Sequence, residues 1–142
     1  MKILVDTNVI LDVWLAREPY WKDSALLLAR IERGQAVGYL CPTTITTLHY
    51  LGKKVLGEKP VRSLLNDLLE IFEVGTLTPT VFKKALDSKV VDFEDAVIEA
   101  VAIASHVDVI ATRNLKDFRK SRIQAREPAQ IIKEKAGGGA GG

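Results

Sequence analysis

Short apolar runs alternate with segments of helical periodicity along this chain, and this alternation limits the possible folds more than any other feature. The runs Lys2–Val5, Val37–Cys41 and Asp108–Ala111 are predicted to be buried strands, with a further strand at Ile71–Val74 and a last short one from Ile123. Helical spacing is found between them at Trp21–Arg33, from Pro42 through Lys54, and at Pro60–Glu70, Thr80–Leu86, Phe93–Ser105 and Pro128–Lys135. The pattern favours an α/β fold: a central, mostly parallel sheet of four to five short strands with helices on both faces.

The chain has 142 residues, which suits one domain with a hydrophobic core. We assign residues 1–136 to that domain and the glycine-rich residues 137–142 to an appended tail or linker. No stretch approaches the roughly 18 apolar residues that span a bilayer, and Asp6 comes before a signal-peptide core could form. Cys41 is the only cysteine and is expected to be a buried packing thiol. These features favour a cytoplasmic protein without a membrane partner.

Polar and acidic residues follow two of the predicted strands. Asp6 ends the first strand, and Thr112-Arg113-Asn114 follows the strand at 108–111. If these two strands are parallel neighbours, both groups lie at the edge of the sheet where α/β proteins bind ligands. Asp6 by itself could equally be the N-cap of the following turn.

Acids also open the apolar segment Phe93–Ser105, in the sequence Asp92-Phe93-Glu94-Asp95. Helix capping by Asp92 and the helix dipole explain acids at this place. Asp95, however, begins an apolar stretch, and a carboxylate that enters a core needs a partner or a cation. Carboxylates gathered at one site suit Mg²⁺ or Mn²⁺. Such ions polarise phosphoryl oxygens and activate water for attack on phosphorus.

The net charge of +2 is too small to indicate nucleic-acid binding by itself. Basic residues are nevertheless concentrated in one segment, whose only acid is Asp117. Its members are Arg113, Lys116, Arg119, Lys120, Arg122 and Arg126. They form either an ordinary solvated surface or, next to a phosphate-processing site, a surface that holds a nucleic-acid backbone.

Three segments together resemble the PIN-domain family. Leu4–Val9 (LVDTNV) is similar to the opening of PIN domains, Asp92–Ala100 (DFEDAVIEA) to their D-A-x-x-x-A helix, and Ile110–Phe118 (IATRNLKDF) to their T-R-[DN]-x-x-D-F segment. Their order and spacing match over nearly all of residues 2–132, and the size is that of bacterial VapC toxins and their stand-alone relatives.

The resemblance implies a metal-dependent endoribonuclease, either the toxin of a toxin–antitoxin pair or a stand-alone relative. It implies Asp6, Asp95 and Asp117 as ligands of Mg²⁺ or Mn²⁺, with Asn114 and Thr112 completing the catalytic site and Asn8 helping to orient it. Arg113, Lys116 and Arg119 would then bind single-stranded or loop RNA. Trp14, Tyr20 and Trp21 could stack on bases or pack in the core. The expected partners are RNA, a second copy of the chain and an antitoxin, for which Leu64, Leu65, Leu68 and Leu69 offer an apolar helix face.

One residue departs from the family pattern. The family places a Glu in the pattern I-T-x-x-E, and here Ile45–His49 has His49 at that position. His49 could bind Mn²⁺, act as a base or phosphate contact, or be structural. Asn114 in place of Asp removes a further charge, so the site could hold one metal loosely rather than two tightly.

Two other readings stay open. The first is a catalytically weak or inactive PIN-fold module that binds RNA or protein; the missing Glu supports it, and the presence of Asp6 and Asp95 argues against it. The second is a receiver or haloacid-type phosphohydrolase. Asn8, where the phosphohydrolase needs a second Asp, and the lack of a receiver's acidic pair argue against that class.

Overall fold

The computed structural model describes residues 1–134, in which five parallel strands form one sheet in the order β3-β2-β1-β4-β5. The strands are β1 (Lys2–Val5), β2 (Val37–Leu40), β3 (Phe72–Val74), β4 (Val109–Ala111) and β5 (Ala125–Arg126). β1 is central and pairs with β2 and β4, so that Leu4 lies opposite Tyr39 on one side and Ile110 on the other. The predicted parallel sheet is therefore confirmed, and the two strands that precede Asp6 and Thr112 are neighbours.

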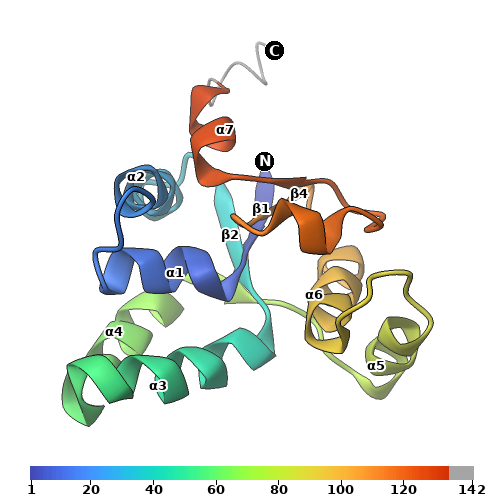
Figure 1. The fold of residues 1–142 in the computed structure, drawn as a ribbon, viewed down its shortest axis with the longest axis horizontal. Coiled ribbons are helices and arrows are strands. Elements are labelled where there is room, and N and C mark those ends of the chain that lie inside the picture. The colour runs from blue at the N-terminus through green and yellow to red at the C-terminus, as the bar shows by residue number, and fades with distance from the viewer. Residues whose placement is uncertain (135–142) are drawn as a thin grey trace.

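Helices cover both faces of this sheet (Figure 1). The helices are α1 (Thr7–Trp14), α2 (Trp21–Glu32), α3 (Pro42–Leu56), α4 (Glu58–Ile71), α5 (Pro79–Leu86), α6 (Phe93–Ala104), α7 (Pro128–Lys133) and the 3-10 helix η1 (Leu115–Phe118). Ile3 and Val5 pack into a core with α1–α4 and α7, whereas Leu4 and Ile110 pack into a second core with α5, α6 and Phe118. Alternate β1 side chains thus serve opposite faces, as in other buried parallel strands.

Two elements were not predicted. α1 follows β1 directly because Asp6 caps it, with the Asp6 carboxylate accepting a hydrogen bond from the Thr7 backbone N–H at 2.8 Å. η1 is a single tight turn, which leaves little periodicity in a sequence. The other boundaries differ from prediction by one or two residues. The helix expected at Pro128–Lys135 ends at Lys133, and residues 135–142, including the expected tail, lie outside the described part of the chain.

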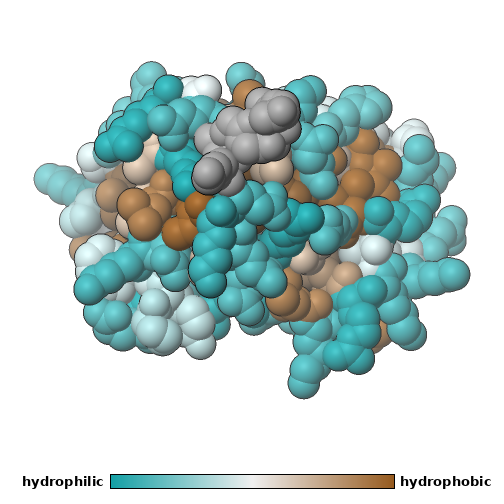
Figure 2. Space-filling model, turned by 90° about the horizontal axis from the view of Figure 1, so that it is seen from above, coloured by the Kyte–Doolittle hydropathy of each residue, from teal (hydrophilic) through white to brown (hydrophobic). Residues whose placement is uncertain are grey.

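Several packing predictions are resolved by the fold. Cys41 is fully buried, and burial raises the pKa of its thiol, so it is a packing residue as expected. On α4, Leu68 is buried in the core and Leu65 packs against it, whereas Leu69 is exposed. Two of the four leucines of that predicted apolar face are therefore used within the chain, while Leu64 is half-buried outside this core. The surface seen from above carries hydrophilic side chains with separate apolar patches between them (Figure 2). Among residues 1–134, no helix has the length and apolar character needed to cross a bilayer.

Candidate active site

Asp6 lies at the carboxyl end of the central strand and is 5% exposed. Its backbone N–H continues the pairing with β4 by donating to the carbonyl of Ala111 at 2.9 Å. The Oδ2 atom of Asp6 accepts a hydrogen bond from the Thr112 hydroxyl at 2.8 Å. Burial raises the pKa of Asp6, and the charges of Glu94 and Asp117 act in the same direction, while the hydrogen bonds from Thr112 and Thr7 oppose the rise. A buried carboxylate is thus held in one orientation at the sheet edge.

Thr112, which directly follows β4, and Asn8, in the first turn of α1, hold this carboxylate in place. Thr112 is fully buried, and its Oγ1 also accepts from the backbone N–H of Asn114 at 3.0 Å. The Asn8 amide donates to Asp6 Oδ2 at 3.2 Å and to Thr112 Oγ1 at 3.3 Å. The orienting function that the sequence suggested for Thr112 and Asn8 agrees with these contacts, since both bind Asp6 directly.

Asp95 lies in the first turn of α6 and is half-buried. Its backbone N–H donates to the Asp92 carboxylate at 3.0 Å, so Asp92 is the N-cap of this helix. Burial and the charges of Asp6, Asp92, Asp117 and Glu94 raise the pKa of Asp95 to about 7. The acids from β1, α6 and η1 therefore lie close enough to repel one another.

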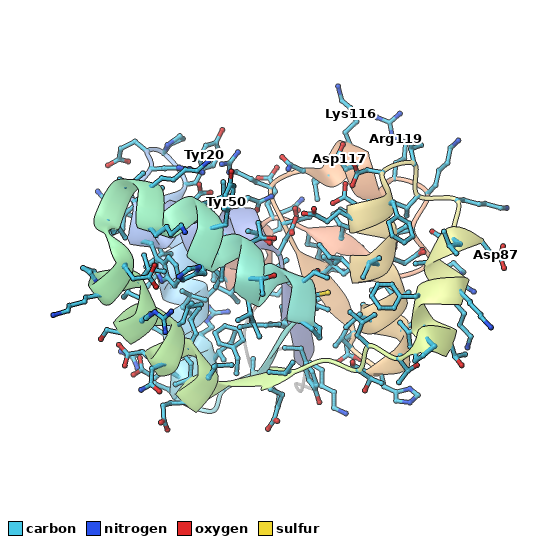
Figure 3. All side chains as sticks on the ribbon, turned by 90° about the horizontal axis from the view of Figure 1, so that it is seen from below. Tyr20, Tyr50, Asp87, Lys116, Asp117 and Arg119 are labelled. Atoms are coloured by element: carbon cyan, nitrogen blue, oxygen red, sulfur yellow. The ribbon has the colours of Figure 1, made fainter. Side chains whose placement is uncertain are left out.

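The remaining predicted residues lie on and beside η1. Asp117 is exposed, and its backbone N–H donates to the carbonyl of Asn114 at 3.0 Å. Asn114 is exposed at the start of η1. Lys116 and Arg119 are exposed on either side of Asp117, and all three side chains extend from the same edge of the molecule (Figure 3). Positive charge is thus present next to the acids.

Arg113 has a partner that the sequence did not predict. Its Nε and Nη2 atoms donate to the two carboxylate oxygens of Asp12, at 2.6 and 3.0 Å, and its guanidinium stacks on the ring of Tyr20 with its central carbon 4.5 Å from the ring centroid. Asp12 is 1% exposed. Arg113 therefore pairs with the buried carboxylate of Asp12. Its guanidinium contacts Asp12 and Tyr20, whereas the side chains of Lys116 and Arg119 are exposed. A signal existed in the sequence, because Asp12 follows Val9, Ile10 and Leu11 on a short apolar helix.

Glu94 is a second residue missed by sequence reasoning, which gave it only a helix-dipole role. Its charge raises the pKa of both Asp6 and Asp95.

His49 contacts a different acid. Its Nε2 donates a hydrogen bond to the Glu58 carboxylate at 2.7 Å, and the hydrogen bonds from His49 and Arg62 lower the pKa of Glu58 to about 2. No hydrogen bond among residues 1–134 joins His49 to the acids at the sheet edge.

The three aromatic residues that could stack on bases lie in different environments. Trp14 packs against the core, as the alternative interpretation held. Trp21 is half-buried and donates from its indole N–H to Glu18 at 3.0 Å. Tyr20 is exposed and already carries the guanidinium of Arg113.

The acidic residues fit a hard divalent cation in donor type. Within residues 1–134, no group of three or more His, Cys, Asp or Glu side chains is arranged to hold a metal ion directly. Mg²⁺ does not need such a group, because it retains several waters and is commonly held by one or two carboxylates. Asp95 supports the fit, since its carboxylate accepts no hydrogen bond within the described residues and lies among like charges. Asp6 and Asp95 could hold such an ion directly, with Asp117 contacting it through water.

Comparison with known proteins gives a family and a fold. A family model described as a PIN domain matches residues 2–116. The structure is similar to that of DNA-bound VapBC from Salmonella typhimurium, with a TM-score of 0.69 and 16% identity over 90% of this chain and 98% of that chain. VapBC-1 from nontypeable Haemophilus influenzae gives 0.68 and 16% over 90% and 98%, and FitAcB from Neisseria gonorrhoeae gives 0.60 and 20% over 89% and 97%. No curated protein sequence matches the chain.

Proposed function

This chain belongs to the PIN-domain family, as its three motifs predicted, and on that premise we propose that it is a metal-dependent endoribonuclease that hydrolyses RNA phosphodiester bonds. The observation that carries the proposal is the arrangement of acids at one edge of the sheet: Asp6 is buried there with its carboxylate held by Thr112 and Asn8, and Asp95 and Asp117 are near enough for their charges to act on one another. Asp6 from β1, Asp95 from α6 and Asp117 from η1 are far apart in sequence, yet the pKa of Asp95 reaches about 7 because of burial and of these charges. Such a costly arrangement is typical of a functional site.

The cofactor in this proposal is Mg²⁺ or Mn²⁺, held by Asp6 and Asp95. Bound there, the ion would counter the negative charge of the phosphate and activate water for attack. Thr112 and Asn8 keep the Asp6 carboxylate in place through their hydrogen bonds. Lys116 and Arg119 bind the RNA backbone, which gives affinity without sequence preference.

The test is cleavage of a mixed-sequence single-stranded RNA in Mg²⁺, in Mn²⁺ and in EDTA. Native protein is compared with Asp6→Asn and Asp95→Asn, and with Asp67→Asn as a control for loss of one exposed carboxylate on α4. We expect cutting that needs the metal, is retained in the control and is lost in both site variants. Cutting that persists in EDTA, or in both site variants, would refute the proposal.

A second candidate function has an observation in its favour. His49 stands where the family has Glu and is paired with Glu58, and residues 1–134 lack a ready-made group of three metal ligands. A PIN-fold module that binds RNA or protein without cutting would fit these facts. RNA binding without cleavage in either metal, by protein whose Asp6→Asn variant binds equally well, would favour this candidate.

We further propose a cytoplasmic location, a homodimer and an antitoxin partner. The support is the family and the similar structures, among which are FitAB and VapBC bound to DNA. Light scattering of the purified chain tests the dimer. Rescue of growth by a co-expressed neighbouring gene, in cells where the chain alone arrests growth, tests the antitoxin.

A further inference from the structure

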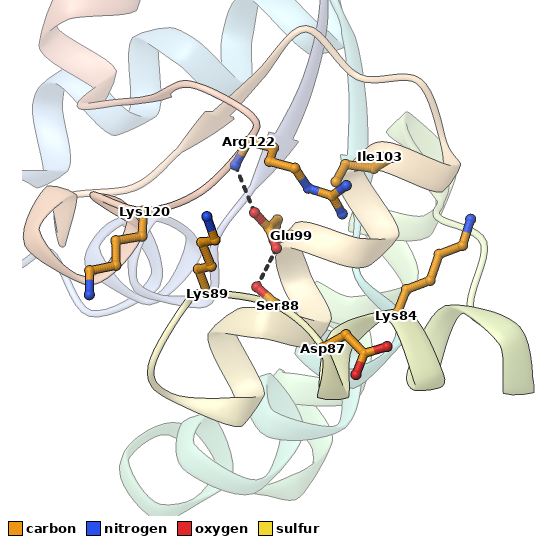
Figure 4. Close-up of a pocket in the computed structure, with 8 residues that line it drawn as sticks. All are labelled: Lys84, Asp87, Ser88, Lys89, Glu99, Ile103, Lys120 and Arg122. Carbon is orange, nitrogen blue, oxygen red and sulfur yellow. Dashed lines mark hydrogen bonds between the residues drawn. The ribbon is translucent and has the colours of Figure 1, made fainter.

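We call the group of Asp6, Asp95 and Asp117 the carboxylate site. A cavity of about 390 Å³ lies beside it, between α5, α6 and the segment after η1 (Figure 4). Four cationic side chains line it: Lys84, Lys89, Lys120 and Arg122. The other lining residues include Asp87, Ser88 and the apolar Ile103. Among residues 1–134, no aromatic side chain lines the cavity, so this part of the chain offers charge to a ligand there and no surface for base stacking.

Glu99 also lines this cavity, and both of its carboxylate oxygens are hydrogen-bonded within the protein. It is 2% exposed, and its two carboxylate oxygens accept hydrogen bonds from the Ser88 hydroxyl and from the Arg122 backbone N–H, the latter at 2.7 Å (Figure 4). Ser88 belongs to the loop between α5 and α6, and Arg122 to the segment after η1. Glu99 therefore ties together the two loops that carry three of the cations, Lys89, Lys120 and Arg122.

The cavity is joined to the carboxylate site by a smaller one. This second cavity, of about 120 Å³, is lined by Asp117, Lys116 and Arg119, and also by Lys89 and Lys120, which line the first. Shared lysines make the two cavities neighbours along one surface. Positive side chains thus continue along the surface from Asp117 to Lys84 on α5. We call this surface, made up of Lys116, Arg119, Lys120, Lys89, Arg122 and Lys84, the basic path.

We propose that the basic path binds the phosphodiester backbone of single-stranded RNA on one side of the bond to be cut. The inference rests on the proposed nuclease function and adds four residues to its substrate contacts: Lys84, Lys89, Lys120 and Arg122. Lysines and arginines without aromatic partners bind phosphates independently of base sequence. Such a path holds a strand long enough to extend beyond the cleavage site, whereas a dinucleotide at the acids does not reach it.

The experiment measures RNA binding in EDTA, so that cleavage is absent, by fluorescence anisotropy over a range of salt concentrations. Native protein is compared with Lys89→Ala/Lys120→Ala and with a control, Lys53→Ala/Lys59→Ala. The control removes the same charge from exposed positions on α3 and α4, at the opposite end of the molecule (Figure 1). The probes are a single-stranded RNA of about 12 nucleotides, of the order of the site size of single-strand binders, and a dinucleotide. Circular dichroism and thermal unfolding check that each variant is folded.

For the longer RNA, loss of two phosphate contacts should reduce the slope of log affinity against log salt by about 1.4, because each contact to a single strand contributes about 0.7. At about 0.1 M salt this corresponds to a loss of affinity of roughly 10- to 30-fold. The dinucleotide and the control variant should show no change. Equal slopes for the path variant and the control, or an equal loss with the dinucleotide, would overturn the basic path. Altered slopes in a protein that never cuts RNA would support the path while refuting the proposed activity.

Discussion

Replacing Asp95 by Asn should make the metal-free protein more stable at neutral and alkaline pH while abolishing cleavage. The carboxylate of Asp95 is half-buried, and burial and the charges of Asp6, Asp92, Asp117 and Glu94 raise its pKa from the ordinary 3.8 to about 7. A shift of this size corresponds to about 4 kcal/mol. Because Asp95 is partly exposed, solvent screening reduces this, and we expect about 1–2 kcal/mol. The helix dipole at the start of α6 favours the charged form by roughly 0.5 kcal/mol, which is smaller.

The sign of the pH dependence follows from the raised pKa. Between about pH 4 and pH 7 the folded protein holds a proton on Asp95 that the unfolded chain has released, so the free energy of unfolding falls as the pH rises through this range. In Asp95→Asn this contribution is absent. The two proteins should therefore be nearly equal in stability at pH 4, and the variant should be the more stable at pH 8.

Urea unfolding in EDTA from pH 4 to pH 8 measures the effect, with Asp67→Asn on α4 as the control for charge removal at an exposed position. Saturating Mg²⁺ should reverse the order, because binding to the native site stabilises the folded protein by about 2.7 kcal/mol at 100 times the dissociation constant. An Asp95→Asn variant no more stable than the control at pH 8 would mean that Asp95 does not face the other acids and that these carboxylates do not share one site.

Other predictions concern residues around the site. Thr112→Val should lower the free energy of unfolding by about 1–3 kcal/mol and slow cleavage, since Asp6 loses a buried hydrogen bond. Thr112→Ser keeps the hydroxyl and should retain both stability and activity, as measured by urea unfolding and cleavage assays. Arg113→Ala should lower the free energy of unfolding by about 1.5–3 kcal/mol, because the buried Asp12 loses two charge-assisted hydrogen bonds and keeps only the longer contact with Arg17 at 3.6 Å; normal stability with weaker RNA binding would instead make Arg113 an RNA contact. Glu99→Gln should lower the free energy of unfolding by about 1–3 kcal/mol and speed amide hydrogen exchange at Arg122, whereas unchanged exchange would show that Glu99 does not hold that loop.

The parts of the fold that the sequence predicted are those decided by burial. Lys2–Val5 and Asp108–Ala111 are short apolar runs because parallel strands are covered on both faces, and the same patterns placed Asp6 and Thr112 at the ends of neighbouring strands. α1 escaped prediction because Asp6, which caps it, was assigned to the proposed metal site, and its hydrogen bond to the Thr7 backbone N–H shows that it also begins the helix.

The parts that could not be predicted depend on contacts between distant segments. Asp12 and Arg113 are 101 residues apart, so the pairing that occupies the Arg113 guanidinium is not visible in local sequence. The pairing of His49 with Glu58 joins α3 to α4 and depends on how these helices pack. The basic path likewise depends on Glu99, whose hydrogen bonds bring the loop of Ser88 and the segment of Arg122 together.

The central position of β1 sets the order in which the acids can meet during synthesis. β1 is made first, but its neighbour β4 begins at Val109, and Asp117 comes later still. A growing chain that ends before β4 exposes an unpaired edge of β1 and lacks the hydroxyl of Thr112 that orients Asp6. Pairing between such distant segments is slow to form. The carboxylate site therefore cannot assemble on the ribosome until most of the domain has emerged.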